Sequence, residues 1–232
     1  MSLDNWSHLK ILTYSKQELN LERKKWLGWN ELPEPKAGNT GNYKEIQEFL
    51  FHLVREHKPK NILEIGFNAG HSACCFLNAS PLSKMYTFDI CIHGTEKEAC
   101  RVLKKHFDIE LIEGDSIETV PKFFEINKIS DDHDLKFDLV FVDGYHGFDK
   151  DNGKMMPYED IKNTIDYVND GGLLIIDDYE LIDVAKSSER FDWKEKGFRE
   201  IEFKEFEKPL FKDVIKKNKS KKLRIMKKLN RS

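Results

Sequence analysis

The stretch Asn61-Ile-Leu-Glu-Ile-Gly-Phe-Asn-Ala-Gly-His71 is a short apolar run that breaks into closely spaced glycines. The apolar part predicts a buried strand ending near Gly66, and the residues after it predict a tight turn through Asn68 and Gly70. Glycine suits such a turn because a Cβ would obstruct both the turn and the approach of a ligand to the backbone. The stretch therefore predicts the first ligand-binding turn of an α/β protein, with an adenosine-containing cofactor as the expected ligand.

Strand and helix patterns alternate along the rest of the chain. Strands are expected over residues 61–66, 85–90, 109–113, 137–142 and 172–177. Helices are expected over residues 42–57, from residue 95 onwards and from residue 158 to 168, and the first two begin with the capping boxes Asn42-x-x-Glu45 and Thr95-x-x-Glu98. This alternation predicts a parallel sheet with helices on both faces.

The length of 232 residues suits a single domain with a full-sized core. Residues 1–41, which hold Trp6, Trp26 and Trp29, are interpreted as an irregular or partly helical lead-in. Such a segment either forms a lid over an active site or covers one edge of the sheet, and its tryptophans suit a lid, a core or a subunit interface equally well. Residues 42–232 are expected to form the domain itself.

The C-terminal part of the chain is strongly basic, although the whole chain has a net charge of −3. Ten residues between Lys212 and Arg231 are Lys or Arg. Such a run can contact RNA phosphates, but it is more often a solvated edge strand followed by a tail, here about residues 216–232. We favour the second interpretation, so nucleic acid is not an expected partner. Closing strands are expected over residues 198–206 and then over 211–215 or 223–226.

Other features favour a cytoplasmic location. No apolar stretch approaches the roughly 20 residues that span a bilayer, so no membrane contact is expected. The N-terminal residues lack the basic-then-apolar pattern of a signal peptide. The four cysteines show no metal-binding spacing, and the adjacent pair Cys74 and Cys75 is expected in the core.

The glycine turn differs from the dinucleotide fingerprint Gly-x-Gly-x-x-Gly, because Asn68 and His71 occupy its second and third glycine positions. An NAD-dependent dehydrogenase is therefore disfavoured. Asp89 ends the next expected strand, where a carboxylate can accept hydrogen bonds from both hydroxyls of a ribose. Asp115 and Ser116 follow the third strand, where a side chain can meet an adenine amine.

The order Leu63-Glu-Ile-Gly-x-x-x-Gly70, Asp89, Gly114-Asp115-Ser116 and Phe137-Asp-Leu-Val-Phe-Val-Asp143 resembles the class I S-adenosylmethionine-dependent methyltransferases over about residues 40–180. The resemblance implies a Rossmann-like, mostly parallel seven-stranded sheet with an antiparallel closing strand. It implies that the glycine turn faces the methionine part of the cofactor, that Asp89 holds the ribose and that Ile90 packs on the adenine. The implied cofactor-binding residues are Glu64, Gly66, Phe67, Asn68, Gly70, Asp89, Ile90, Asp115 and Ser116.

Three carboxylates follow the fourth and fifth strands: Asp143, Asp177 and Asp178. In a parallel sheet both strand ends open onto the same edge, where clustered carboxylates repel one another unless a cation or protons intervene. Oxygen ligands suit Mg²⁺ or another hard divalent cation. The motifs Asp143-Gly-x-His146 and Asp177-Asp178 resemble the cation-dependent O-methyltransferases, which implies metal binding by these three acids. The alternative is that Asp177 and Asp178 cap the next helix while Asp143 contacts only the cofactor.

A divalent cation lowers the pKa of a hydroxyl and orients its oxygen for attack on the sulfonium methyl group. His146 is the expected general base, because an imidazole titrates near neutral pH. Related sugar-modifying enzymes often carry an acid where this chain has Tyr145, so Tyr145 or a distant residue is an alternative base. The predicted catalytic residues are therefore Asp143, Tyr145 and His146.

The expected activity is methylation of a hydroxyl on a small molecule, for example a sugar or a glycan. The alternatives are a methyltransferase that acts on nucleic acid or protein, which would use the basic C-terminal run, and a non-catalytic cofactor-binding module. The segment Asp143-Gly-Tyr-His146 lacks the Asn/Asp-Pro-Pro-Tyr/Phe motif of many nitrogen-methylating enzymes. The resemblance also makes a homodimer an expectation.

Overall fold

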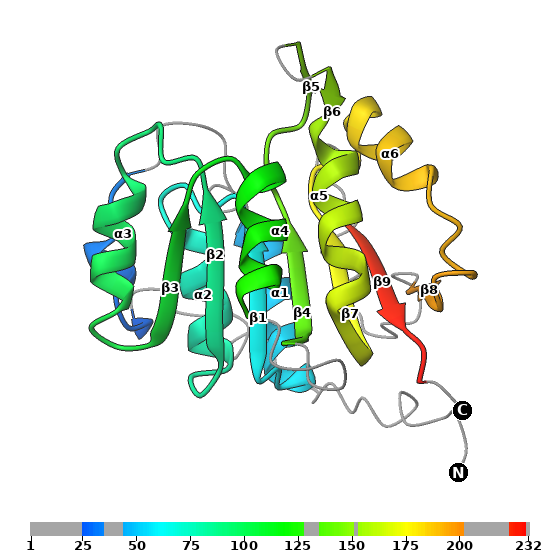
Figure 1. Cartoon of the computed structure of the whole chain (residues 1–232). Helices are drawn as coiled ribbons and strands as arrows, with labels where there is room; N and C mark the ends of the chain where they lie inside the picture. The colour runs from blue at the N-terminus through cyan, green and yellow to red at the C-terminus, as the bar shows by residue number, and fades with distance from the viewer. Residues whose placement is uncertain (1–24, 35–43, 128–134, 151–152, 202–222, 231–232) are drawn as a thin grey trace.

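The computed structural model of the chain describes residues 25–34, 44–127, 135–150, 153–201 and 223–230. Its centre is a seven-stranded sheet with helices on both faces (Figure 1). The strands of this sheet are β1 (Asn61–Ile65), β2 (Lys84–Asp89), β3 (Asp108–Glu113), β4 (Phe137–Val142), β7 (Val168–Ile176), β8 (Phe198–Glu200) and β9 (Arg224–Lys228). The helices are η2 (Trp29–Glu31), α1 (Lys44–His57), α2 (His71–Ala79), α3 (Glu96–Leu103), α4 (Ser116–Ile126), α5 (Met156–Thr164), η4 (Ile165–Tyr167) and α6 (Ile182–Glu189).

The strand order is β3-β2-β1-β4-β7-β9-β8. Strands β3, β2, β1, β4 and β7 pair in parallel, whereas β9 pairs antiparallel with both β7 and β8. The predicted fold, a mostly parallel seven-stranded Rossmann-like sheet with an antiparallel closing strand, is therefore confirmed. The short hairpin of β5 (Phe148–Asp149) and β6 (Lys154–Met155) rises from the carboxyl edge of the sheet, at the top of Figure 1.

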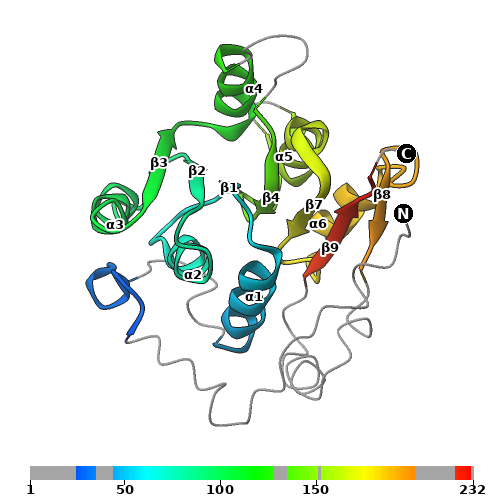
Figure 2. The ribbon, with the colours of Figure 1, turned by 90° about the horizontal axis from the view of Figure 1, so that it is seen from below.

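The sheet separates two apolar cores. Seen along the strands, α1 and α2 lie on one side of the sheet, and α4 and α5 lie on the other (Figure 2). Alternate residues of each central strand enter the two cores, so Phe141 packs with the α1 and α2 side chains and Val140 packs with those of α4 and α5. This double coverage explains why residues 139–142 of β4 and residues 173–176 of β7 are continuously apolar.

Two details differ from the sequence prediction. The predicted helix over 158–168 ends earlier, because Val168 already begins β7. The Thr95 side chain makes no capping hydrogen bond at α3. Glu96 instead accepts a hydrogen bond from the backbone N–H of His93 at 2.9 Å. The capping box proposed for α1 begins at Asn42, which lies outside the described residues.

The position of β9 corrects the prediction of a basic edge strand. Arg224–Lys228 lies between β7 and β8, and its Ile225 and Met226 are buried on opposite faces of the sheet. Lys228 is 7% exposed, and its ammonium group donates a hydrogen bond of 2.7 Å to the carbonyl of Lys196. The long apolar stems of such lysines pack in the sheet while their charged ends reach polar atoms. Residues 211–215, the alternative closing strand, lie outside the described residues.

The described part of the lead-in packs against helices α1 and α3. Trp26 is buried and stacks on Phe51 of α1 with ring centroids 5.1 Å apart. A Cβ at Gly28 would meet Leu103 of α3 at 3.3 Å. This part of the lead-in therefore contributes to the core, while Trp6 lies outside the described residues.

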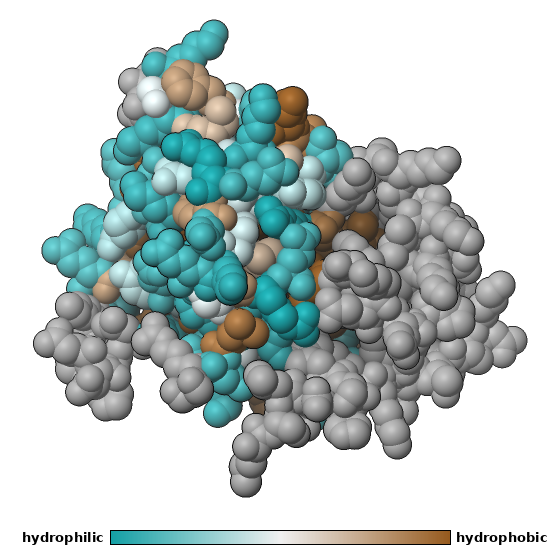
Figure 3. All heavy atoms as spheres, turned by 90° about the vertical axis from the view of Figure 1, so that its right-hand side faces the viewer, coloured by the Kyte–Doolittle hydropathy of each residue, from teal (hydrophilic) through white to brown (hydrophobic). Residues whose placement is uncertain are grey.

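The described surface is predominantly polar on the face that carries α6 and β8, where apolar residues form separate small patches (Figure 3). None of the helices among the described residues combines the length and the apolar character needed to cross a bilayer.

Candidate active site

The carboxyl ends of the central strands lie level with one another. Ile65 pairs with both Phe88 and Val142, and Val142 pairs with Ile176. The loops that follow β1, β2, β4 and β7 therefore start from one edge of the sheet, where open α/β sheets bind ligands. A cavity of about 860 Å³ lies at this edge. The candidate residues that line it are Gly66, Phe67, Asn68, Asp89, Ile90, Asp115, Ser116, Asp143, Tyr145, His146 and Asp178.

Asp89 connects the two loops on one side of this cavity. Its Oδ2 accepts hydrogen bonds from the backbone N–H groups of Phe67 at 2.8 Å and Asn68 at 2.9 Å, and its Oδ1 accepts one from Cys91 at 2.7 Å. Three donors leave a carboxylate one further acceptor position for a ligand hydroxyl. Asp89 thus holds the glycine turn in shape as well as facing the cavity.

The glycine turn is tighter than the sequence indicated. A Cβ on Gly66, whose φ is +90°, would lie 1.9 Å from the backbone oxygen of Asp143. The absence of a side chain therefore serves the close approach of the loop after β4, not only access for a ligand. Asn68 also has a left-handed backbone (φ +48°), and its side-chain oxygen is buried without a hydrogen-bond partner among the described residues. Gly70 caps α2 and packs under the ring of Phe67.

Glu64 does not reach the cavity, although it was predicted as a cofactor-binding residue. Its side chain is fully buried in β1 and accepts hydrogen bonds from the hydroxyl groups of Ser72 and Thr87. Burial raises the pKa of Glu64 to about 7, against the opposing effect of these two hydrogen bonds. Its role is to connect β1 with β2 and with the first turn of α2.

The loop after β3 carries Asp115 and Ser116, which also line the cavity. Asp115 is the N-cap of α4 and accepts a hydrogen bond from the backbone N–H of Ile117 at 3.0 Å. Ser116 donates a hydrogen bond of 2.6 Å to Asp160, a buried residue of α5. Ile90 also lines the cavity and is 53% exposed.

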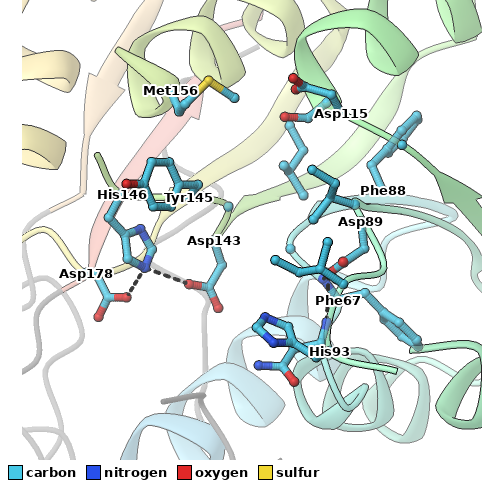
Figure 4. Close-up of a pocket in the computed structure, with 18 of the residues that line it drawn as sticks. Phe67, Phe88, Asp89, His93, Asp115, Asp143, Tyr145, His146, Met156 and Asp178 are labelled. Atoms are coloured by element: carbon cyan, nitrogen blue, oxygen red, sulfur yellow. Dashed lines mark hydrogen bonds and ion pairs between the residues drawn. The ribbon is translucent and has the colours of Figure 1, made fainter. Parts of the chain in front are cut away.

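Polar side chains from two strand ends meet on the opposite side of the cavity (Figure 4). The Nε2 atom of His146 lies 2.8 Å from Oδ2 of Asp178 and 3.9 Å from Oδ1 of Asp143. Ligand atoms of these three residues lie within 4.8 Å of one another, which makes them a group suited to one metal ion. Tyr145, beside them, is 65% exposed at the cavity rim.

Asp177 is not part of this group, which differs from the predicted set of metal ligands. Ile176 points into the core under α4 and α5, so the alternation of β7 directs Asp177 to the other face, where it is 1% exposed. Asp178 has a left-handed backbone (φ +50°) that turns its carboxylate toward His146. The structure thus places His146, and not Asp177, beside Asp143 and Asp178.

Several cavity residues were not identified from the sequence. His93 lies beside Phe67 and Asp89 (Figure 4). Phe148, Asp149 and Lys150 also line the cavity and belong to the β5–β6 hairpin. His93 lies only four residues after Asp89, so its closeness in sequence to a predicted cofactor-binding residue could have identified it. The hairpin residues offered no such signal, because two-residue strands have no recognisable periodicity.

Comparison with protein-family models finds one match, to a methyltransferase domain, over residues 63–179. This match spans just over half of the chain and contains both sides of the cavity. The chain belongs to this methyltransferase family. The expectation of a class I S-adenosylmethionine-dependent methyltransferase is thereby confirmed. No curated protein sequence shows a significant match to the chain.

Solved structures similar to this methyltransferase include the O-methyltransferase TomG from Streptomyces achromogenes in complex with S-adenosylmethionine. The two are 15% identical with a TM-score of 0.57 and full coverage of both chains. An O-methyltransferase from Bacillus cereus in complex with S-adenosylhomocysteine is 16% identical, with a TM-score of 0.56. The alignment covers 95% of the present chain and 94% of the Bacillus chain. At this level of identity the similarity shows a shared fold.

Proposed function

We propose that this methyltransferase transfers the methyl group of S-adenosylmethionine to a hydroxyl oxygen of a small molecule, for example a sugar or a glycan. The observation that carries the proposal is the cluster of Asp143, His146 and Asp178, which shares one cavity with Asp89 and Asp115. The cavity thus has a side with the features expected for an adenosine cofactor and a side with carboxylates and an imidazole.

The first side fits the cofactor in several respects. The remaining acceptor position of Asp89 suits a ribose hydroxyl, and Ile90 offers an apolar surface to an adenine. The buried oxygen of Asn68 suits the amino group of the methionine part. The free acceptor capacity of Asp115 suits the adenine amine. Bound there, S-adenosylmethionine supplies an electrophilic methyl group on its sulfonium.

The second side fits a divalent cation. The carboxylate oxygens of Asp143 and Asp178, which lie within 4.8 Å of each other and of the His146 imidazole, are hard ligands that suit Mg²⁺ and also Mn²⁺. We propose that Asp143 and Asp178 hold such an ion. Its chemistry would be to lower the pKa of the acceptor hydroxyl and to orient it.

His146 is the proposed proton acceptor. Its Nε2 atom lies 2.8 Å from the carboxylate of Asp178 and 3.9 Å from that of Asp143, on the side of the cavity where the acceptor hydroxyl is proposed to bind. In the reaction the acceptor oxygen forms a bond to the methyl carbon, the bond from that carbon to sulfur breaks, and the hydroxyl proton passes to His146. Tyr145, which lines the same cavity, is proposed to contact the acceptor.

Two measurements test the proposal. Calorimetry with S-adenosylhomocysteine and with NAD tests the cofactor, and binding of NAD alone would contradict the proposal. Labelled S-adenosylmethionine is then offered with sugar, phenol and RNA acceptors, and we expect label on a sugar or phenol oxygen. Label only on RNA would instead favour a nucleic-acid methyltransferase.

The metal is tested by Mn²⁺ binding, measured by electron paramagnetic resonance, and by activity after treatment with EDTA. We expect Asp178→Asn to weaken Mn²⁺ binding at least tenfold and to reduce methyl transfer. Asp108→Asn is the matched control, because Asp108 is an exposed carboxylate at the opposite end of β3. Unchanged Mn²⁺ binding in Asp178→Asn, or full activity in EDTA, would refute the metal site.

A further inference from the structure

Asp160 is a buried carboxylate that the proposed chemistry does not use. It lies on α5, is 1% exposed and accepts the 2.6 Å hydrogen bond from Ser116 through its Oδ1. Its Oδ2 is buried and has no hydrogen-bond partner among the described residues. A buried carboxyl oxygen without a partner is costly to stability, so its presence calls for a role.

The surroundings of Asp160 place it between two loops of the active site. On one side it holds Ser116, which follows the predicted adenine-contacting residue Asp115. On the other side a Cβ added to Gly144 would lie only 2.6 Å from the Asp160 Oδ2, so this oxygen packs directly against the loop after β4. Ser116 and Gly144 both line the cavity, whereas Asp160 lies behind them.

The charges around Asp160 come from both loops as well. Burial raises the pKa of Asp160 to about 7, and the hydrogen bond from Ser116 opposes this rise. Asp115 raises the pKa further, while His146 lowers it. The carboxyl group therefore interacts with residues of the cofactor side and of the acceptor side.

We propose that Asp160 is a positioning residue that fixes the Ser116 loop and the Gly144 loop relative to each other. Through Ser116 it sets the adenine end of the cofactor site, and through Gly144 it sets the segment that carries Asp143 and His146. The inference rests on the proposed function of the cavity, but the contacts on which it depends lie outside the cavity surface.

The chemistry of the contacts predicts which substitutions are tolerated. Asparagine has the shape of aspartate, so Asp160→Asn keeps an oxygen for the Ser116 hydroxyl and keeps the packing against Gly144. Alanine removes both contacts and leaves a void. Ser116→Ala removes only the hydrogen bond, while Asp160 still packs against Gly144.

The test measures the affinities of two ligands and records one NMR spectrum. The ligands are S-adenosylhomocysteine and 5′-methylthioadenosine, which keeps the adenosine part but lacks the amino acid part. We expect Asp160→Ala to weaken the binding of both ligands by the same factor, at least tenfold, because the change acts at the adenine end. Asp160→Asn is expected to restore both affinities to within threefold of the wild type.

The spectrum is the amide NMR spectrum without ligand. In Asp160→Ala we expect the signals of both Gly114 and Gly144 to shift, and in Ser116→Ala that of Gly114 alone. Thr164→Val is the matched control, since Thr164 is a fully buried residue of the same helix whose hydroxyl donates hydrogen bonds to the backbone carbonyls of Asp160 and Ile161 rather than to either loop. It is expected to lower thermal stability without changing the two ligand affinities.

The inference is overturned if a folded Asp160→Ala protein binds both ligands like the wild type, or if Thr164→Val causes the same losses. It is also overturned if neither glycine signal moves. Failure of the wild type to bind S-adenosylhomocysteine contradicts the proposed function instead, and the spectrum then still decides whether Asp160 couples the two loops.

Discussion

At the scale of single residues, Gly66 carries the sharpest steric constraint on the site. Its φ of +90° disfavours any side chain, and a Cβ would lie 1.9 Å from the Asp143 carbonyl oxygen. We therefore predict that Gly66→Ala displaces the loop that carries Asp143 and weakens S-adenosylhomocysteine binding at least tenfold, as measured by calorimetry.

Gly153→Ala separates the steric effect from the effect of backbone conformation. Gly153 also has a positive φ (+63°), but nothing lies within 4 Å of the position where its Cβ would be. This control is expected to change ligand affinity less than threefold. Equal losses in the two variants would show that the close approach of Asp143 is not the reason for the glycine.

The raised pKa of Glu64 predicts that the stability of the protein depends on pH. This pKa rises from 4.5 to about 7 in the folded protein. The folded state therefore binds the proton more tightly than the unfolded state, so this contribution to stability is complete below pH 4.5 and is lost as the pH rises through 7. A shift of this size corresponds to roughly 3 kcal/mol of unfolding free energy.

Glu64→Gln removes this titration while keeping acceptors and donors for Ser72 and Thr87. We expect urea unfolding between pH 5 and 8 to show a smaller decline of stability in the variant than in the wild type. Glu110→Gln, at an exposed position of β3, is the control that should keep the wild-type decline. Parallel curves for Glu64→Gln and wild type would contradict the role of this carboxyl.

At the scale of elements, the β5–β6 hairpin contributes three side chains to the wall of the cavity. Phe148, Asp149 and Lys150 reach the cavity from it, and its base is closed by a 3.1 Å hydrogen bond from Met156 to Gly147. We predict that replacing residues 148–155 with two glycines leaves S-adenosylhomocysteine affinity within threefold but lowers methyl transfer at least tenfold.

Lys154→Ala is the control for this experiment, because Lys154 belongs to the hairpin but does not line the cavity. It should retain both binding and transfer. Full methyl transfer without the hairpin would show that the acceptor binds elsewhere.

At the scale of the whole molecule, β9 holds the sheet together over a long separation in sequence. It joins β7 to β8, and Ile225 is 1% exposed in the core under α1 and α2. We predict that Ile225→Ala lowers the free energy of unfolding by about 2–5 kcal/mol, the range for truncating a buried isoleucine. Loss of S-adenosylhomocysteine binding and loss of circular dichroism should occur in the same urea transition.

Ile182→Ala is the matched control, since Ile182 is 65% exposed on α6. It should change stability by less than about 0.5 kcal/mol. Two separate transitions in Ile225→Ala would show that the sheet does not unfold as one unit.

Local patterns predicted most of the elements because each depends on neighbours in the sequence. The strand Phe137–Val142 appears as predicted, since the apolar run over residues 139–142 suits a strand that is covered on both faces. The helix predicted through Val168 ended early because a helical pattern and a buried strand share the same apolar residues. The interior position of β9 was not predictable from its lysines. Their charge suggests exposure, whereas their long apolar stems can be buried while the charged ends reach polar atoms.

The sequence by itself determined the methyltransferase fold and the strand ends at which Asp89, Asp115 and Asp143 stand. These follow from the alternation of apolar runs and turns, which is local information. The tertiary structure decided which side chains meet: His146 rather than Asp177 beside Asp178, Gly66 against the Asp143 backbone, and Asp160 behind Ser116 and Gly144. Such contacts depend on the pleat of each strand and on left-handed backbone at single residues, and neither is visible in the spacing of residue types.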